Sequence, residues 1–260
     1  MKHLAQFRDL CVACGSRTNP KNKEHPFPQW LIARTKTDQT SIRWIPDKRI
    51  PADQATLPLC QQCNTDFGAQ LETPMSHILD DIEDGHGLSD NEAELVVRWL
   101  WKIDGLLWHV SHPTHEYSSV YTLRERVLRP LDRIRGALIL ALALCERVDP
   151  IYGDAPMGLD SHCAIDGMFV SGVFSRTAMM VVLAPFRDLI PREFSSYRLS
   201  PNRFEPAADA KFFYPKTPFP TDTELVGVTR QCSYRLTAAH EAYARQIHSI
   251  ARSNELTRAH

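Results

Sequence analysis

Two pairs of cysteines with the same short spacing are the residues of this chain best suited to chemistry. Cys11 and Cys14 form one Cys-x-x-Cys pair, and Cys60 and Cys63 form the other. Two thiolates separated by two residues lie on one side of a tight turn, and two such pairs can complete a tetrahedral four-sulfur shell. Because this shell leaves no position for water or substrate, the spacing predicts a structural Zn²⁺ rather than a catalytic one.

Disulfides or a thioredoxin-like redox pair are the alternative use of these cysteines. Residues 1–10 contain no hydrophobic signal segment, and the other three cysteines, Cys145, Cys163 and Cys232, are scattered and make the total of 7 odd. An odd, dispersed set fits a reducing compartment better than a disulfide framework. We therefore expect reduced thiols and a cytoplasmic protein.

A Glu-His pair lies between the two cysteine pairs. Glu24 and His25 occur in the segment Lys-Glu-His-Pro-Phe-Pro-Gln-Trp-Leu, and Asn64 follows the last cysteine of the second pair. A histidine, with an ordinary pKa of about 6.5, is suited to take a proton from water near neutral pH. Glutamate and asparagine offer the oxygen ligands that Mg²⁺ and Mn²⁺ prefer. These residue types match phosphodiester hydrolysis, which needs an activated water and a cation beside the phosphate.

In this order, the residues from Cys11 to about Glu72 resemble the HNH, or ββα-metal, nuclease superfamily, in its branch with two zinc knuckles. The resemblance covers roughly the first quarter of the chain. It implies a metal-dependent DNA endonuclease in which His25 is the general base. It also implies that Glu24 and Asn64 bind a catalytic Mg²⁺ or Mn²⁺, and that the protein serves in phage defence or in a mobile element.

The chain lacks the histidine that usually closes the cation site of this family. A helix that begins near Cys63 would carry Asn64 in its first turn, and Glu72, a little over two turns later, would point within about 80° of the same direction. Glu72 is therefore the predicted substitute ligand. His77 is the other candidate, but Thr73-Pro74 is expected to interrupt the helix before it.

The missing histidine leaves a second function open, a catalytically inactive zinc module that binds nucleic acid or a partner protein. The formal net charge of −1 also differs from the basic balance of proteins that grip bare duplex through many phosphates. Affinity for nucleic acid must then come from a local patch, from metal or from an activating partner protein. RNA is the alternative substrate, and apolar helix faces leave a homo-oligomer open.

Charge is unevenly distributed along the sequence. Basic residues gather around the proposed site, beside Trp30 and Trp44, and are expected to face phosphate: Lys21, Lys23, Arg34, Lys36, Arg43, Lys48 and Arg49. The segment from Asp80 to Glu94 is acidic, has no lysine or arginine, and is expected to form a solvated surface.

The expected fold class is α+β, with a small zinc-stabilised ββα-metal module over residues 1–84 and a mainly helical accessory domain over residues 85–260. The accessory domain is expected to begin after an Asp-Gly-His-Gly hinge, with a capping box at Ser89 and Glu92 and an amphipathic helix to about Val110. His109, His112 and His115 near its end are expected at a helix terminus or on the surface, rather than as a second metal site.

A second helix is expected from about Ser118 to Arg147, broken at Pro130, and it would include the apolar run 136–145 as a buried helix. A short antiparallel sheet is expected on either side of residues 175–177. An irregular segment would follow from 191 to 223, and a last helix from about Cys232 to Ser253. The apolar run is about half the length that a bilayer requires, so no membrane span is expected.

Overall fold

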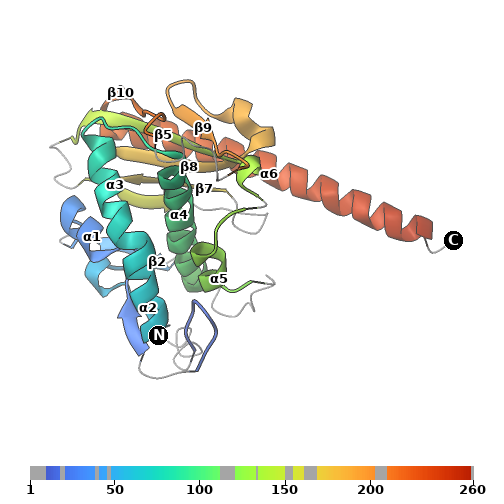
Figure 1. Cartoon of the computed structure of the whole chain (residues 1–260), viewed down its shortest axis with the longest axis horizontal. Coiled ribbons are helices and arrows are strands. Elements are labelled where there is room, and N and C mark those ends of the chain that lie inside the picture. Colours follow the sequence, from blue (N-terminus) through green and yellow to red (C-terminus); the bar gives the residue numbers. More distant parts are fainter. Residues whose placement is uncertain are drawn as a thin grey trace.

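A six-stranded sheet, with helices on both faces, forms the larger part of the fold (Figure 1). The computed structural model describes residues 10–17, 21–38, 41–45, 48–111, 121–132, 134–149, 155–160, 169–202 and 210–258. Its mixture of helices and strands confirms the predicted α+β class. His112 and His115, two of the three weighed histidines, lie outside the described residues.

The N-terminal half of the described chain contains most of the helices, and β5 to β10 follow one another before the last helix. The strands are β1 (Lys21–Glu24), β2 (Ser41–Ile45), β3 (Lys48–Pro51), β4 (Leu57–Cys60), β5 (Leu138–Arg147), β6 (Met157–Asp160), β7 (Val170–Phe174), β8 (Thr177–Leu183), β9 (Ser195–Arg198) and β10 (Lys216–Thr221). The helices are α1 (Gln29–Thr35), α2 (Gln61–Phe67), α3 (Thr73–Glu83), α4 (Asp90–Ser111), α5 (Leu123–Leu128) and α6 (Asp222–Arg258).

Strand β5 pairs with three other strands of the large sheet, which has the order β10-β5-β8-β7-β6. β8 pairs antiparallel with one edge of β5, while the other edge is shared by antiparallel β9 and parallel β10. The predicted hairpin around residues 175–177 is confirmed as β7 and β8. The segment expected to be irregular, 191–223, contains β9 and β10, and the last helix begins earlier than expected, at Asp222.

The expectation of a helix over residues 136–145 is wrong, because most of this run is β5. Residues 138–145 of β5 are all buried. Alternate side chains enter two separate apolar clusters, so that Leu140 packs on the α4 side and Ala141 on the α6 side. A strand covered on both faces needs no polar alternation, and such a run cannot be distinguished from a buried helix by periodicity alone.

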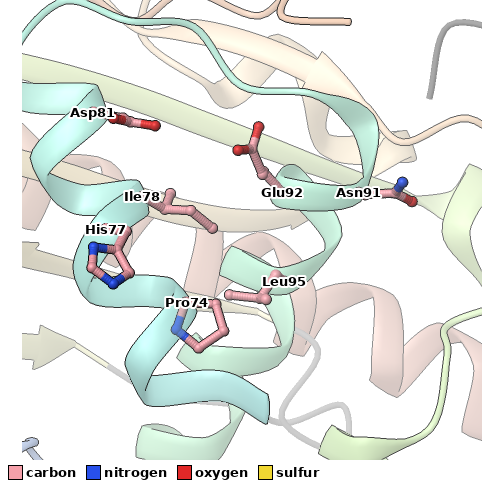
Figure 2. A pocket seen from close by; sticks show the side chains of 7 residues that line it. All are labelled: Pro74, His77, Ile78, Asp81, Asn91, Glu92 and Leu95. Atoms are coloured by element: carbon pink, nitrogen blue, oxygen red, sulfur yellow. The ribbon is translucent and has the colours of Figure 1, made fainter. Parts of the chain in front are cut away.

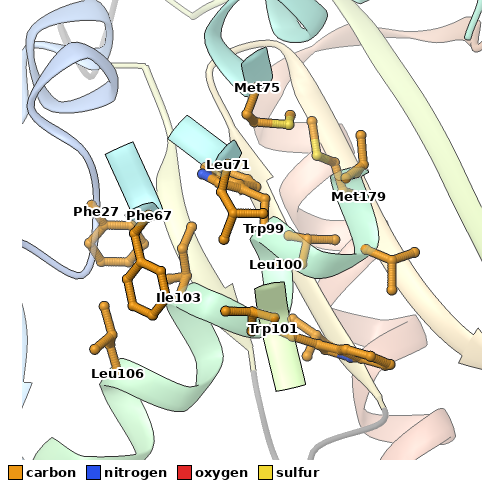
Figure 3. Packing of buried hydrophobic residues seen from close by; sticks show 14 of the residues in the cluster. Phe27, Phe67, Leu71, Met75, Trp99, Leu100, Trp101, Ile103, Leu106 and Met179 are labelled. Carbon is orange, nitrogen blue, oxygen red and sulfur yellow. The ribbon is translucent and has the colours of Figure 1, made fainter. Parts of the chain in front are cut away.

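Helix α4 joins the sheet to the N-terminal elements. Its predicted capping box is confirmed, since Glu92 N donates to Ser89 Oγ at 3.3 Å and Ser89 N donates to Glu92 Oε2 at 2.7 Å. Buried side chains of α4, including Trp99 and Ile103, share one cluster with Phe67 of α2 and Met179 of β8 (Figure 3). One hydrophobic core therefore crosses the predicted boundary at residues 84 and 85.

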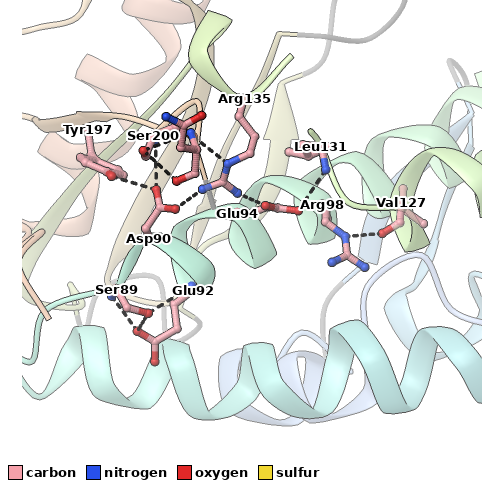
Figure 4. A network of polar contacts seen from close by, with 11 residues as sticks. Ser89, Asp90, Glu92, Glu94, Arg98, Val127, Leu131, Arg135, Tyr197 and Ser200 are labelled. Carbon is pink, nitrogen blue, oxygen red and sulfur yellow. Dashed lines mark hydrogen bonds and ion pairs between the residues drawn. The ribbon is translucent and has the colours of Figure 1, made fainter. Parts of the chain in front are cut away.

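The acidic segment is not wholly a solvated surface, because two of its carboxylates are buried. Arg135, fully buried, pairs with Asp90 and Glu94 of α4 and donates from Nε to the Ser200 carbonyl at 2.7 Å (Figure 4). Asp90 also accepts from the Tyr197 hydroxyl at 2.8 Å. The acidic residues at the start of α4 thus fasten this helix to the segments around β9.

The helix after the second cysteine pair continues through Thr73-Pro74, contrary to expectation. A single π-helical turn, Gly68–Glu72, connects α2 directly to α3. Pro74 lies in the first turn of α3, directly after the π turn, where the helical hydrogen bonds change from one spacing to another. The wider π turn also changes the direction of Glu72 relative to an ideal α-helix.

Helix α6 covers the second face of the sheet, and its C-terminal end projects beyond it (Figure 1). His240 of α6 is fully buried and contacts the ring of Phe186 in a tilted arrangement, with ring centroids 4.1 Å apart. Burial lowers the pKa of His240 below its ordinary value, although a hydrogen bond to the Leu236 carbonyl opposes this. No helix among the described residues is both long and apolar enough to cross a membrane.

This buried histidine predicts a loss of stability in acid. As the pH falls below about 6.5, the unfolded chain binds a proton at His240 that the folded chain does not, so the free energy of unfolding decreases. Urea titrations at pH values of about 7 and about 5 measure this decrease. Between these two pH values, the free energy of unfolding should decrease less in His240→Phe than in the parent. The exposed His77→Ala variant serves as the control, and equal pH dependence of His240→Phe and the parent would contradict the prediction.

Candidate functional site

The four paired cysteines meet at one point. Their sulfur atoms all lie within 4.8 Å of one another, and Cys14 Sγ is 3.9 Å from Cys60 Sγ. Tetrahedral zinc with Zn–S bonds of about 2.3 Å places its sulfurs about 3.8 Å apart. The four thiols therefore fit a structural zinc ion, and no other group of His, Cys, Asp and Glu side chains among the described residues forms such a cluster.

The backbone around the knuckles explains this convergence. Gly15, with φ of 72°, closes the first turn, and its N–H donates to the Cys11 carbonyl at 2.8 Å. Val12 N donates to the Pro58 carbonyl at 3.1 Å and so attaches this turn to β4. β4 ends at Cys60, whose sulfur caps α2 by accepting from Cys63 N at 3.5 Å.

The thiols of Cys11 and Cys63 act as a pair. The hydrogen bond between them lowers the pKa of Cys11 and raises the pKa of Cys63. Zinc binding would favour the thiolate form at all four positions.

Arg124 of α5 connects both knuckles. Its backbone N–H donates to the Ala13 carbonyl at 2.8 Å, and its guanidinium lies 3.5 Å from Cys63 Sγ and pairs with Asp66 of α2. A cation at this position offsets part of the negative charge of four thiolates.

Replacement of Arg124 should therefore weaken zinc binding. We expect Arg124→Met to lower the affinity for zinc by about 10- to 100-fold, as is typical when a partner of a metal ligand is lost. Competition with a chromogenic chelator measures this. Arg129→Met, also on α5 but with a largely exposed side chain paired to Glu125, is the control, and equal affinities of the two variants would contradict the proposed role of Arg124.

Glu24 and Glu72 converge on a lysine that sequence analysis missed. Lys102 Nζ lies 2.8 Å from Glu24 Oε1 and 2.5 Å from Glu72 Oε1, and its side chain has 0% exposure. Burial raises the pKa of Glu24, an effect that Lys102 opposes and Glu72 increases. Burial lowers the pKa of Lys102, but the two carboxylates more than offset this, so the pKa lies above its ordinary value.

His25 follows β1 and is half-buried. Its Nε2 lies 2.9 Å from the Asp53 carbonyl oxygen. Because a carbonyl oxygen only accepts hydrogen bonds, the neutral form of this ring carries its proton on Nε2 and has its lone pair on Nδ1.

Asn64 and His77 have different surroundings. Asn64 is half-buried in the first turn of α2, and no hydrogen bond among the described residues joins its side chain to Glu24 or Glu72. His77 lines a pocket of about 320 Å³ between α3 and α4 (Figure 2). Asp81 and Glu92 also line this pocket, and both pair with Lys211.

No family model, curated protein or solved structure matches this chain. The resemblance to HNH nucleases therefore depends on the residues and contacts described above.

Two residues of the sequence-based site have surroundings that were not expected. Arg34, expected to face phosphate, pairs with Asp80 and with Glu83 at 2.6 Å. His109 lies in the last turn of α4, as expected for a helix terminus, but it is buried rather than on the surface. Burial lowers its pKa to about 4 despite a hydrogen bond with the Val12 backbone.

Proposed function

We propose that this chain is a zinc-braced HNH-type endonuclease that hydrolyses phosphodiester bonds in DNA, with His25 as the general base. The order of elements supports this proposal. β1 ends at Glu24 and pairs antiparallel with β4, and β4 leads through the second cysteine pair into α2. Two paired strands followed by a helix, with a zinc site at the junction, is the ββα arrangement that the resemblance implies.

The observation that carries the proposal is the orientation of His25. Its Nε2–H donates to the Asp53 carbonyl, so the imidazole is held in one tautomer. Nδ1 of the half-buried ring is then suited to take a proton from a water molecule that attacks the phosphorus atom. A fixed ring with one unprotonated nitrogen is the requirement for a general base at this position.

Phosphodiester hydrolysis also requires positive charge beside the phosphate and the leaving 3′ oxygen. A Mg²⁺ or Mn²⁺ ion held by Glu24 and Asn64 would supply it. Glu72, predicted as a third ligand, contacts Lys102, as does Oε1 of Glu24. A divalent ion bound by Glu24 would therefore share this carboxylate with Lys102.

A substrate panel tests the proposed activity. Zinc-loaded protein is incubated with duplex, single-stranded and branched DNA and with RNA, in the presence of Mg²⁺, Mn²⁺ or neither. The proposal expects endonucleolytic cleavage of at least one DNA. Cleavage of RNA alone would reassign the substrate, and intact substrates throughout, also with candidate partner proteins present, would contradict the proposal.

A catalytically inactive zinc module that binds nucleic acid or a partner protein is the second candidate. The observation that favours it is the buried ion pair of Lys102 with Glu24 and Glu72. In this pair, the two predicted cation ligands bind a lysine and hold the fold together rather than bind a metal ion. Binding of the same DNA panel without cleavage would support this second function.

A further inference from the structure

We propose that Lys102 is the resident cation of Glu24 and Glu72, and that its ammonium group excludes a divalent metal ion from the position between these two carboxylates. The inference deepens the proposed function, on which its relevance to hydrolysis rests. According to this inference, Glu72 is not a ligand of the catalytic metal ion.

The positions of the charged atoms carry the inference. Lys102 Nζ lies between the carboxylates, 2.8 Å from Glu24 Oε1 and 2.5 Å from Glu72 Oε1. A Mg²⁺ ion bound by the same two oxygens would lie about 2.1 Å from each of them. The ion and the ammonium group would therefore compete for the same two oxygens.

The ammonium group is also fully used. Besides the two carboxylates, it lies 3.3 Å from the His25 carbonyl and 3.5 Å from the Pro26 carbonyl. Three N–H donors thus face four acceptors, and the side chain is fully buried. Lys102 has no donor left for a substrate phosphate. Its ammonium group instead binds the two carboxylates and the carbonyls of the turn that carries His25.

Helix α4 holds this lysine in place. The neighbouring Trp101 and Ile103 are buried in the core, and the N-terminal end of the helix is fixed by the pairs of Asp90 and Glu94 with Arg135. A metal ion that displaced the ammonium group would leave a buried charge without its partners, which is strongly unfavourable.

Binding of Mn²⁺ alone to the zinc-loaded protein, followed by electron paramagnetic resonance, tests the inference without any cleavage assay. In the otherwise intact protein, Glu72→Gln is expected to change the Mn²⁺ affinity by less than about twofold, because Glu72 is not a metal ligand. In Lys102→Ala, the freed carboxylates are expected to bind one additional Mn²⁺ about tenfold or more tightly than the parent binds it there. The double variant Lys102→Ala/Glu72→Gln should lose this added site.

A tenfold or greater loss of Mn²⁺ affinity in Glu72→Gln alone would overturn the inference, since Glu72 would then be a ligand beside Lys102. A folded Lys102→Ala protein that gains no Mn²⁺ would overturn it as well. If Lys102→Ala does not fold, the Mn²⁺ affinities of the parent and of Glu72→Gln alone decide whether the inference holds. A parent protein that cleaves nothing defeats the proposed function but leaves this metal-binding result unchanged.

Discussion

Replacement of Cys60 by serine is expected to abolish zinc binding and to unfold the N-terminal elements that carry His25. Cys60 ends β4, caps α2 through its sulfur, and lies 3.9 Å from Cys14 Sγ. Structural zinc in small modules has an apparent binding free energy of about 10–16 kcal/mol, and this binding energy is folding energy. Loss of one of four ligands therefore removes the largest stabilising contribution to this part of the chain.

Elemental analysis and amide hydrogen exchange measure this result together. The parent should contain one zinc per chain, as a four-thiolate shell requires, and Cys60→Ser none. Exchange should accelerate in β1, β4 and the first turn of α2. Cys232→Ser is the matched control, because Cys232 is a buried thiol on α6 outside the cysteine cluster. A Cys60→Ser protein with the zinc content and exchange pattern of the parent would refute the structural role of the metal.

Arg135→Met is expected to destabilise the fold by about 3–5 kcal/mol, because it leaves two buried carboxylates without their cation. Asp90 and Glu94 are each 4% exposed, and both pair with the fully buried guanidinium. Removal of Arg135 also frees the Ser200 carbonyl, which accepts from its Nε (Figure 4). The expected effect is large because these charges cannot reach water.

Urea denaturation of Arg135→Met and of Arg192→Met separates a buried charge from a surface one. Arg192 has 95% exposure and pairs with Glu193, so its loss should cost less than about 0.5 kcal/mol. Adding Asp90→Asn and Glu94→Gln to Arg135→Met should restore part of the stability, because uncompensated charge is the cause of the loss. Equal free energies of unfolding for the two arginine variants would show that the buried network contributes nothing.

Features with a local sequence pattern were predictable from the sequence. Each Cys-x-x-Cys pair is such a pattern, and the two pairs together predicted one metal cluster, in which the four sulfurs converge. The capping box before α4 and the β7–β8 hairpin depend on residues within a few positions of one another. These patterns depend on neighbouring residues, so they can be recognised without knowledge of the tertiary structure.

Features set by the tertiary structure were not predictable in this way. The apolar run that forms β5 matched a helix as well as a strand, and only the layers formed by α4 and α6 decide between them. Pro74 was expected to break a helix, but the π turn before it places it in the first turn of α3. Local patterns do not encode either outcome.

Lys102 is the clearest omission from the sequence-based site. It interrupts the apolar segment Trp99-Leu-Trp-Lys-Ile103 on a helix otherwise interpreted as core. A lysine in the buried part of such a helix requires an acidic partner. That signal was present, but its partners, Glu24 and Glu72, lie 78 and 30 residues away in the sequence and could not be identified without the fold.

The rate of DNA cleavage by His25→Ala, relative to the parent and to His77→Ala, is the most direct test of the account. All three proteins must first show the same zinc content and the same thermal unfolding. Loss of a general base typically lowers a rate by about 10²–10⁴-fold, so His25→Ala should fall by this factor while His77→Ala cleaves like the parent. Equal cleavage rates for His25→Ala and the parent would contradict the assignment of His25 and, with it, the proposed nuclease site.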